Sequence, residues 1–204
     1  STDEEIGRGL PHAEIARRAV AGGADVVQLR EKRLSGRSFF NAAVAVREVT
    51  REAGALFIVN DRLDVALAAG ADGVHLGATD LPIEQARRLA PPGFIVGASV
   101  GSVATAVLAA EEGADYVALS PTFSTTSKDD AGPGHGLATL SAVRSAVSLP
   151  LVAIGGITAG NVADVIAAGA DGVAVISAVV GQDDVTAAAR DLRSRIAAAK
   201  ARSR

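Results

Sequence analysis

The 204-residue sequence contains no cysteine, and only 3% of its residues are aromatic. The absence of cysteine excludes disulfides, thiolate metal sites and a thiol nucleophile, and it is typical of a cytoplasmic protein. No stretch approaches the roughly 18 uninterrupted apolar residues of a membrane span, and the charged residues 1–10 lack the apolar centre of a signal peptide. The net charge of -3 provides no basic field for nucleic acid or an anionic membrane. Any anion must therefore be bound by local groups.

Alanine and valine dominate the apolar residues, which make up 49% of the chain. Alanine-rich helices packed on valine-rich strands are typical of a close-packed α/β structure. The chain is long enough to form one sizeable core, and nothing in it indicates a linker. We therefore expect a single domain over residues 1–204.

The run Gly-Ala-Asp-X-Val occurs four times, each time after an alanine-rich helical stretch and before an apolar strand. The glycine suits a left-handed helix end, and the aspartate suits the polar turn that leads into the strand. These aspartates are predicted to be structural, because they would lie at the amino-terminal ends of strands, away from the catalytic face of a barrel. They are Asp25, Asp72, Asp115 and Asp171.

Apolar segments and helical patterns alternate along the whole chain. The predicted strands cover residues 26–29, 56–59, 74–76, 94–98, 116–119, 151–154 and 173–176. The predicted helices cover residues 11–21, 37–53, 63–69, 82–89, 102–111, 137–146, 159–167 and 184–199. This alternation predicts an α/β fold of the (β/α)8 TIM-barrel type with right-handed crossovers.

The repeat falls on alternate strands, which requires one more strand ahead of the helix that begins near Pro11. The acidic stretch 1–9 does not have the composition of a buried parallel strand. We therefore expect that the first strand is absent from this chain, or that the barrel is open or filled in another way.

Two strand ends near the carboxyl terminus favour phosphate binding. Strand 151–154 leads into Gly155 and Gly156, and strand 173–176 leads into Ser177, in each case with a helix expected to follow directly. Free backbone N–H groups and a helix start attract phosphate at this position of a barrel. The alternative is that the two glycines form only a tight turn.

Charged residues follow the first three predicted strands. Arg30 and Lys32 are two residues apart, so in an extended backbone both cations lie on one side and suit a diphosphate. The alternative is a solvated loop with salt bridges to Glu31. Asp61 and Asp80, with Asn60 beside them, could supply hard oxygen ligands for Mg²⁺. The alternative is that both aspartates are helix N-caps.

Hydroxyl groups are found at two further strand ends. Ser99 ends strand 94–98, and residues 120–130 form a long hydroxyl-rich loop that carries Lys128. This loop could cover the barrel as a lid and hold phosphate, or it could be a disordered excursion. His75, inside a strand, is interpreted as a hydrogen-bonded core residue.

Two anion-binding regions at one barrel mouth suggest two phosphorylated substrates. A general base is not obvious, but departure of a metal-bound diphosphate would not need a strong one.

Together these stretches resemble the thiamin phosphate synthase family, in the same order and over nearly the whole chain. They are Gln28–Lys32, Asn60–Arg62, Gly73–Gly77 with Asp80, Gly97–Ser99, Thr125–Lys128, Ile154–Ile157 and Val175–Ala178. The resemblance implies a Mg²⁺-dependent transferase that joins hydroxymethylpyrimidine diphosphate to hydroxyethyl-methylthiazole phosphate. In that family diphosphate leaves first, and the thiazole nitrogen captures the pyrimidine carbocation.

The resemblance also implies roles for individual residues. Asp61 and Asp80 would bind Mg²⁺, and Ser99 would lie beside the pyrimidine, with Arg30, Lys32, Ser99 and Lys128 as the catalytic set. The pyrimidine diphosphate would be held by Gln28, Arg30, Lys32, Asn60 and Lys128. The thiazole phosphate would be held by Thr125, Ser127, Gly156, Ile176 and Ser177.

The chain departs from the family pattern at three places. Ala78 stands where glutamine is common, Ser127 replaces a threonine of a lid that usually also carries proline, and the initial strand is not visible. Two alternatives are a thiazole tautomerase of a sister family on the same barrel and a non-catalytic ligand-binding regulator. The expected partners are small-molecule substrates, without nucleic acid or membrane, and the sequence is compatible with a homo-oligomer.

Overall fold

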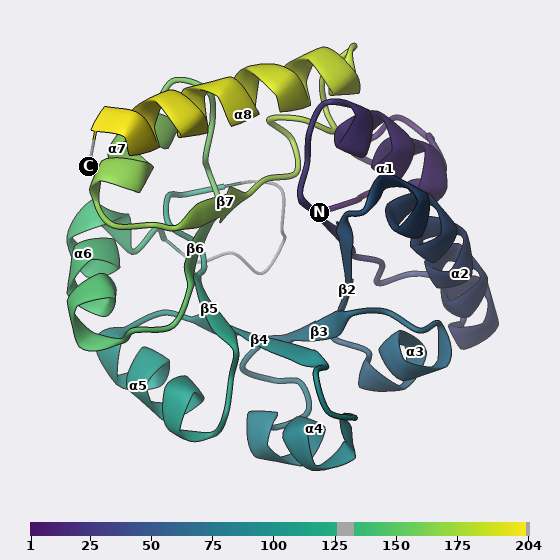
Figure 1. Cartoon of the computed structure of the whole chain (residues 1–204), viewed down its shortest axis with the longest axis horizontal. Helices are drawn as coiled ribbons and strands as arrows, with labels where there is room; N and C mark the ends of the chain where they lie inside the picture. Colours follow the sequence, from purple (N-terminus) through teal and green to yellow (C-terminus); the bar gives the residue numbers. More distant parts are fainter. Residues whose placement is uncertain (126–132, 203–204) are drawn as a thin grey trace.

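The computed structural model describes residues 1–125 and 133–202, and in this part of the chain seven parallel strands form one curled sheet inside a layer of eight helices (Figure 1). The strands pair in chain order from β1 to β7. Their bounds are β1 Val26–Leu29, β2 Leu56–Asn60, β3 Gly73–Leu76, β4 Ile95–Val100, β5 Tyr116–Leu119, β6 Leu151–Ile154 and β7 Gly172–Ala174. The TIM-barrel-like α/β fold expected from the sequence is confirmed.

The helices occupy the intervals that the sequence predicts. They are α1 His12–Ala21, α2 Gly36–Ala53, α3 Leu63–Ala68, α4 Ile83–Leu89, α5 Val103–Glu111, α6 Gly136–Ala146, α7 Val162–Ala167 and α8 Val185–Arg202. None of the helices in the described ranges is both long and apolar enough to cross a lipid bilayer.

Several element boundaries differ from the prediction. Strand β4 runs to Val100, so Ser99 lies inside it instead of at its end, and helix α8 runs to Arg202. Strand β7 ends at Ala174, so residues 175 and 176 lie beyond it. Helix α7 begins at Val162 instead of residue 159, because Asn161 fixes a turn ahead of it. The Asn161 side chain accepts a hydrogen bond from the Thr158 backbone N–H at 2.8 Å and donates one to the Gly156 carbonyl at 2.9 Å.

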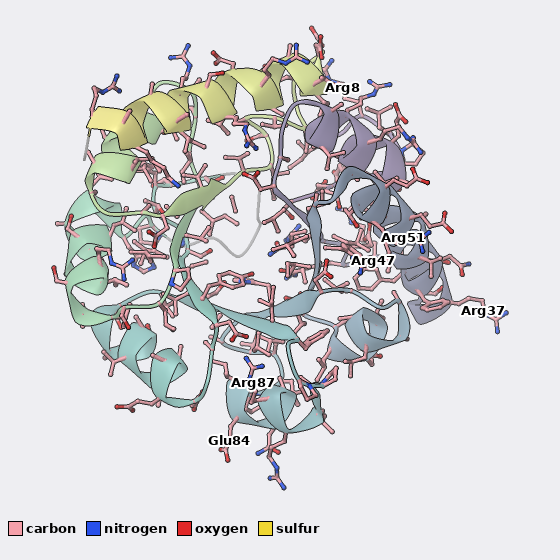
Figure 2. All side chains as sticks on the ribbon, viewed as in Figure 1. Arg8, Arg37, Arg47, Arg51, Glu84 and Arg87 are labelled. Carbon is pink, nitrogen blue, oxygen red and sulfur yellow. The ribbon has the colours of Figure 1, made fainter. Side chains whose placement is uncertain are left out.

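The repeated aspartates have the structural role that the sequence predicts. Asp72 accepts hydrogen bonds from the backbone N–H of Phe57, at 2.7 Å, and from Arg47 on α2, at 2.8 Å. Asp72 therefore fastens the start of β3 to β2 and to α2. Asp115 does the same with Val96 and with Arg87 on α4, and Asp171 with Leu151 and Arg144 (Arg47 and Arg87 are labelled in Figure 2).

The side chains pack into two large apolar clusters, one for each half of the barrel. One cluster unites β1–β3 with α1–α4 and includes the fully buried Phe39 and Phe57. The other joins β4–β6 to α5–α8. A third, small cluster of Ile15, Ile176 and Val180 contacts Ile6, which belongs to the amino-terminal segment, residues 1–9. Because the strands pack against the helices in both large clusters, the strands and their carboxyl ends are held in fixed positions.

The amino-terminal segment spans the seam of the barrel between β1 and β7 (Figure 1). Thr2 forms a single parallel bridge with Leu29, and its N–H donates to the Gln28 carbonyl at 2.8 Å. The ammonium group of Ser1 donates to the Val175 carbonyl at 2.9 Å. The prediction that residues 1–9 do not form a buried parallel strand is confirmed, although they contribute one bridge to the sheet.

The barrel interior is not filled below this bridge. A cavity of about 540 Å³ extends among the inner faces of the strands and the facing sides of α1 and α8. Its lining is mainly apolar and includes Ile58, Ile95 and Val152 from the sheet and Ile15 and Leu192 from the helices. In the part of the chain that the structure describes, the sheet has seven strands, and only one bridge joins the amino-terminal segment to β1 at the seam.

Candidate active site at the barrel mouth

Two acidic side chains meet at the carboxyl ends of β2 and β3, the end of the barrel that we call the mouth. Asp61 directly follows β2 in a left-handed conformation with φ 65°, and its N–H donates to the His75 carbonyl of β3 at 2.8 Å. Asp80 lies after β3, and its carboxylate accepts a hydrogen bond from the Gly77 N–H at 2.6 Å. The two carboxyl groups are hydrogen-bonded to each other.

Burial raises the pKa of Asp61 from 3.8 to about 6, and the Asp80 carboxyl adds to this rise. The positive charges of Lys32 and Arg30 act in the opposite direction and lower the pKa. Asp80, Lys32 and Arg30 therefore all lie close enough to Asp61 to change its pKa, although the four residues come from three different strand ends. The sequence predicted this convergence because all four residues follow the carboxyl ends of neighbouring strands.

The alternative that these aspartates are helix N-caps is wrong. Within the described residues, helix α3 has Arg62 at its N-cap and helix α4 has Pro82, and neither end carries a side-chain cap hydrogen bond. Arg62 instead forms an ion pair with Asp64 at 2.6 Å on the exposed side. The carboxyl groups of Asp61 and Asp80 are thus not used as helix caps and can bind a ligand in the mouth.

Arg30 is held by the amino-terminal segment. Its guanidinium lies 3.4 Å from the Asp3 carboxylate, and the two side chains are only 11% and 16% exposed. Glu31 does not pair with Arg30 but lies against His12 at 3.4 Å on the other side of the strand. The alternative of a loop with salt bridges to Glu31 is therefore wrong for Arg30.

A chain of hydrogen bonds crosses the barrel floor beneath the mouth. The His75 ring contacts the Tyr116 hydroxyl at 2.8 Å through Nδ1 and the Ser99 hydroxyl at 2.9 Å through Nε2. Burial raises the pKa of Tyr116 above its ordinary value, and a hydrogen bond with the Gln28 side chain opposes this rise. His75 is 6% exposed and is a hydrogen-bonded interior residue, as predicted. The buried Asn60 lies directly before Asp61 at the end of β2.

Sequence reasoning missed Tyr116 as part of this site. Its partner across the sheet is Gly97, and a methyl group on that glycine would lie 2.0 Å from the Tyr116 ring. Glycine in β4 therefore makes room for an aromatic ring that crosses the barrel. The only tyrosine of the chain in a strand, paired with a strand glycine, was the available signal.

The second group of residues faces the first from β6 and β7. A small cavity of about 30 Å³ is lined by Thr125, Gly156, Ile176 and Ser177, together with neighbouring backbone. Four of the five residues predicted for the thiazole phosphate thus lie at one place. The fifth, Ser127, and also Lys128 lie outside the described residues.

Gly155 and Gly156 have left-handed conformations, with φ 100° and 64°. A methyl group on Gly156 would lie 2.7 Å from both the Phe123 Cβ and the Ser124 carbonyl. The stretch 121–125 lies alongside these glycines, where the Thr122 N–H donates to the Ile154 carbonyl at 2.7 Å. The turn therefore requires glycine both for its backbone conformation and for close packing.

One expectation for this region is wrong. Helices were expected to follow both strand ends directly, but after β6 helix α7 begins only at Val162. After β7 a single turn forms, in which the Val180 N–H donates to the Ile176 carbonyl at 2.7 Å, and α8 begins at Val185. Any anion here would be bound by the N–H groups of short turns instead of the end of a long helix.

The fold and this arrangement of side chains are those of a TIM-barrel enzyme whose mouth carries an acidic and basic group on one side and a glycine turn on the other. A model of the family described as thiamine monophosphate synthase matches residues 2–179. The chain belongs to this family, whose members are transferases that act on small molecules.

Individual relatives agree over the whole length. The chain is 77% identical to a thiamine-phosphate synthase from Methanoculleus marisnigri, covering 100% of this chain and 96% of that one. It is 61% identical to the enzyme of the same name from Methanoregula boonei, covering 98% and 92%. The solved structure of a thiamine phosphate pyrophosphorylase from Pyrococcus furiosus is 43% identical, with a TM-score of 0.90 over 97% of this chain and 93% of that chain.

Proposed function

We propose that this chain is a thiamin phosphate synthase, which joins hydroxymethylpyrimidine diphosphate to hydroxyethyl-methylthiazole phosphate and releases diphosphate. One observation carries the proposal beyond family membership. The pair Asp61 and Asp80, in the field of Arg30 and Lys32, follows β2 and β3, and the cavity at Gly156 follows β6 and β7 on the opposite side of the curled sheet. Such a site can hold one metal-bound diphosphate and one phosphate ester at the same time.

The acidic pair suits Mg²⁺. Two carboxyl groups in contact repel each other when both are ionised, and the raised pKa of Asp61 reflects this repulsion as well as burial. Mg²⁺ prefers oxygen ligands and is commonly held by one or two carboxylates together with substrate phosphates. Bound there, the ion would supply positive charge to a departing diphosphate.

The cationic side chains of this chain would provide the rest of that charge. Arg30 and Lys32 lie close enough to Asp61 to affect its ionisation, so they would also face a diphosphate bound beside it. Lys128 is proposed to complete this set from the lid. Because charge accumulates on the leaving oxygen, groups that are already in place stabilise the transition state without reorganisation.

The pyrimidine would lie between the diphosphate group and the barrel floor. Gln28 and Asn60 are proposed to bind this substrate, and Ser99 would lie beside its ring. The contact of Ser99 with His75, at 2.9 Å, and that of His75 with Tyr116, at 2.8 Å, fix the orientation of the serine hydroxyl. Tyr116 and His75 are therefore assigned as positioning residues.

The reaction needs no strong general base. The bond between the pyrimidine methylene carbon and the diphosphate oxygen breaks, and its electron pair leaves with the diphosphate. The thiazole nitrogen then donates its lone pair to the carbocation and forms the new carbon–nitrogen bond. No proton is transferred in either step, which explains why a site without an assigned base is sufficient.

The thiazole phosphate would be bound in the cavity at Gly156. Thr125, Ser127 and Ser177 are proposed to donate hydroxyl hydrogen bonds, and the backbone at Gly156 and Ile176 would contact the phosphate and its chain. This arrangement would hold the thiazole nitrogen over the pyrimidine carbon during the short life of the carbocation.

A product assay with the two phosphorylated precursors and Mg²⁺ tests the proposal. We expect formation of thiamin phosphate and diphosphate in equal amounts, loss of turnover in Asp61→Ala and Lys128→Ala, and near-normal turnover in Asp64→Ala, whose carboxylate pairs with Arg62 outside the mouth. Isomerisation of the thiazole without condensation would instead identify a tautomerase. Saturable binding without any product would identify a regulator.

A further inference from the structure

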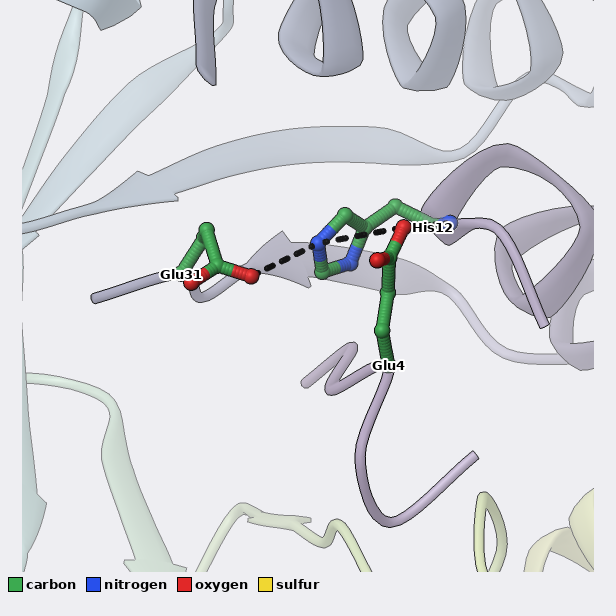
Figure 3. A group of neighbouring side chains, drawn as sticks. All are labelled: Glu4, His12 and Glu31. Atoms are coloured by element: carbon green, nitrogen blue, oxygen red, sulfur yellow. Dashed lines mark hydrogen bonds and ion pairs between the residues drawn. The ribbon is translucent and has the colours of Figure 1, made fainter. Parts of the chain in front are cut away.

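Glu4, His12 and Glu31 direct their side chains toward one another (Figure 3). His12 is the first residue of helix α1, and its side chain is only 1% exposed. Its Nε2 atom lies 3.4 Å from a carboxylate oxygen of Glu31 and 3.8 Å from one of Glu4. The three ligand atoms all lie within 4.8 Å of one another.

Successive side chains after β1 point to opposite sides, and this alternation separates Glu31 from the residues of the mouth. Arg30 and Lys32 act on Asp61 in the mouth, whereas Glu31 between them faces helix α1. Glu4 comes from the amino-terminal segment, which also spans the barrel seam. Three separate parts of the chain therefore converge on a point that is distinct from the acidic pair Asp61 and Asp80.

The orientation of the His12 ring is fixed from behind. Its Nδ1 atom is hydrogen-bonded to the Thr2 hydroxyl at 2.9 Å, in a fully buried contact. This bond leaves Nε2 directed at the two carboxylates. In metal sites the second ring nitrogen of a histidine ligand is generally held by such a partner, which fixes the tautomer and the ring plane.

We propose that Glu4, His12 and Glu31 bind a divalent transition-metal ion of the Zn²⁺ type. Nitrogen and oxygen ligands about 2.1 Å from a tetrahedral ion lie roughly 3.4 Å from each other. The Nε2 to Glu31 distance already has this value, at 3.4 Å, and the Glu4 distance exceeds it by only a few tenths, at 3.8 Å. The Glu4 side chain is 42% exposed, so solvent can reach the site and supply a fourth ligand.

The donor set separates this site from a magnesium site. Imidazole nitrogen is a good ligand for Zn²⁺ and its neighbours in the first transition series, whereas Mg²⁺ selects oxygen. Bound metal would join the amino-terminal segment to α1 and to the loop after β1. Its role would be structural, because it would fasten the segment that spans the seam and that carries Asp3, the partner of Arg30.

Metal titration of the full chain, freed of metal with a chelator, tests the proposal. Zn²⁺ is added in competition with a chromophoric chelator, and Co²⁺ is used to record the visible absorption of a tetrahedral site. We expect one Zn²⁺ per chain, a higher thermal midpoint with Zn²⁺, and no displacement by millimolar Mg²⁺. Glu4→Gln should weaken Zn²⁺ binding at least about tenfold.

Glu5→Gln is the matched control, because Glu5 is the adjacent acid of the same segment but pairs with Arg33 and is 71% exposed. It should bind Zn²⁺ like the unchanged chain. His12→Gln should abolish the Co²⁺ spectrum, and its circular dichroism reports whether the fold is retained. Failure of the folded, unchanged chain to bind Zn²⁺ would overturn the proposal and leave a contact between one imidazole and two carboxyl groups that holds no metal. Equal binding by Glu4→Gln and the unchanged chain would overturn it as well.

Discussion

Asp61 is the acidic residue of the mouth whose pKa the fold raises most clearly. Its pKa is about 6 in the folded chain and 3.8 without the fold. Between these values the native state holds more protons than the unfolded state, so the free energy of unfolding falls as pH rises through this window. Metal bound beside Asp61 would reverse this loss, which links stability to the proposed Mg²⁺ site.

Asp61→Asn should therefore stabilise the metal-free chain at pH 8, because it removes a partly buried charge that Asp80 disfavours. We expect the thermal midpoint with a chelator present to rise by roughly 2–6 °C, and the difference to disappear near pH 4. Asp64→Asn is the control with the opposite sign, since Arg62 lowers the pKa of Asp64. A lower midpoint for Asp61→Asn at pH 8 would show that this carboxylate is stabilising without metal.

Gly156 can be compared with Gly54, because both residues have nearly the same left-handed backbone, with φ 64° and 67°. Replacement by alanine costs roughly 1–2 kcal/mol at either site from the backbone alone. At Gly156 the new methyl group would also meet Phe123 and Ser124 at 2.7 Å, whereas nothing lies within 4 Å at Gly54.

We expect Gly156→Ala to lower the free energy of unfolding by about 1–3 kcal/mol more than Gly54→Ala does. Denaturant unfolding of both variants measures this difference. Equal destabilisation would mean that the stretch 121–125 moves aside without cost. The close packing of the glycine turn would then contribute nothing to stability.

At the scale of the elements, three of the repeated aspartates attach the strand that follows them to the preceding strand, at the end opposite the mouth; they are Asp72, Asp115 and Asp171. Asp72→Ala would leave the Phe57 N–H and the Arg47 guanidinium without their partner and should cost about 2–3 kcal/mol of stability. Asp25→Ala should cost no more than about 0.5 kcal/mol, because the Asp25 side chain is 79% exposed and pairs with Arg193 on the surface. Denaturant unfolding compares the two variants.

Both variants should retain the kcat/KM of the unchanged chain at a temperature where they are folded. A large loss of kcat/KM in Asp72→Ala would contradict the assignment of these aspartates to the structural end of the barrel.

The order of the elements could be predicted from the sequence because alternating apolar runs and helical patterns are local signals that the packed structure leaves unchanged. The convergence of Asp61 and Asp80 followed from the same pattern, since the carboxyl ends of parallel strands meet at one edge. The start of α7 could not be predicted, because it depends on two hydrogen bonds of the Asn161 side chain. The role of Tyr116 depends on the space left by Gly97 in another strand; the two residue types are visible in the sequence, but their pairing requires the register of β4 and β5.

At the scale of the whole molecule, the seam of the barrel was the feature that sequence patterns described least well. A bridge made by Thr2 alone is too short to have a periodicity, yet together with Ser1 it links β1 to the chain beyond β7. The same segment pairs with Arg30 through Asp3 and packs Ile6 against Ile176. The amino-terminal segment therefore both closes the barrel and positions Arg30, which is proposed to bind the diphosphate.

The central claim is that two anionic substrates are bound independently on facing sides of one mouth. Isothermal titration of the unchanged chain, Asp61→Asn and Gly156→Ala with each substrate separately tests this claim most directly. Asp61→Asn should weaken the pyrimidine diphosphate with Mg²⁺ at least about tenfold, or 1.4 kcal/mol, and leave the thiazole phosphate within about twofold. Gly156→Ala should do the reverse. The two-sided site would be contradicted if either variant lost the same affinity for both substrates. It would also be contradicted if both variants bound both substrates as tightly as the unchanged chain.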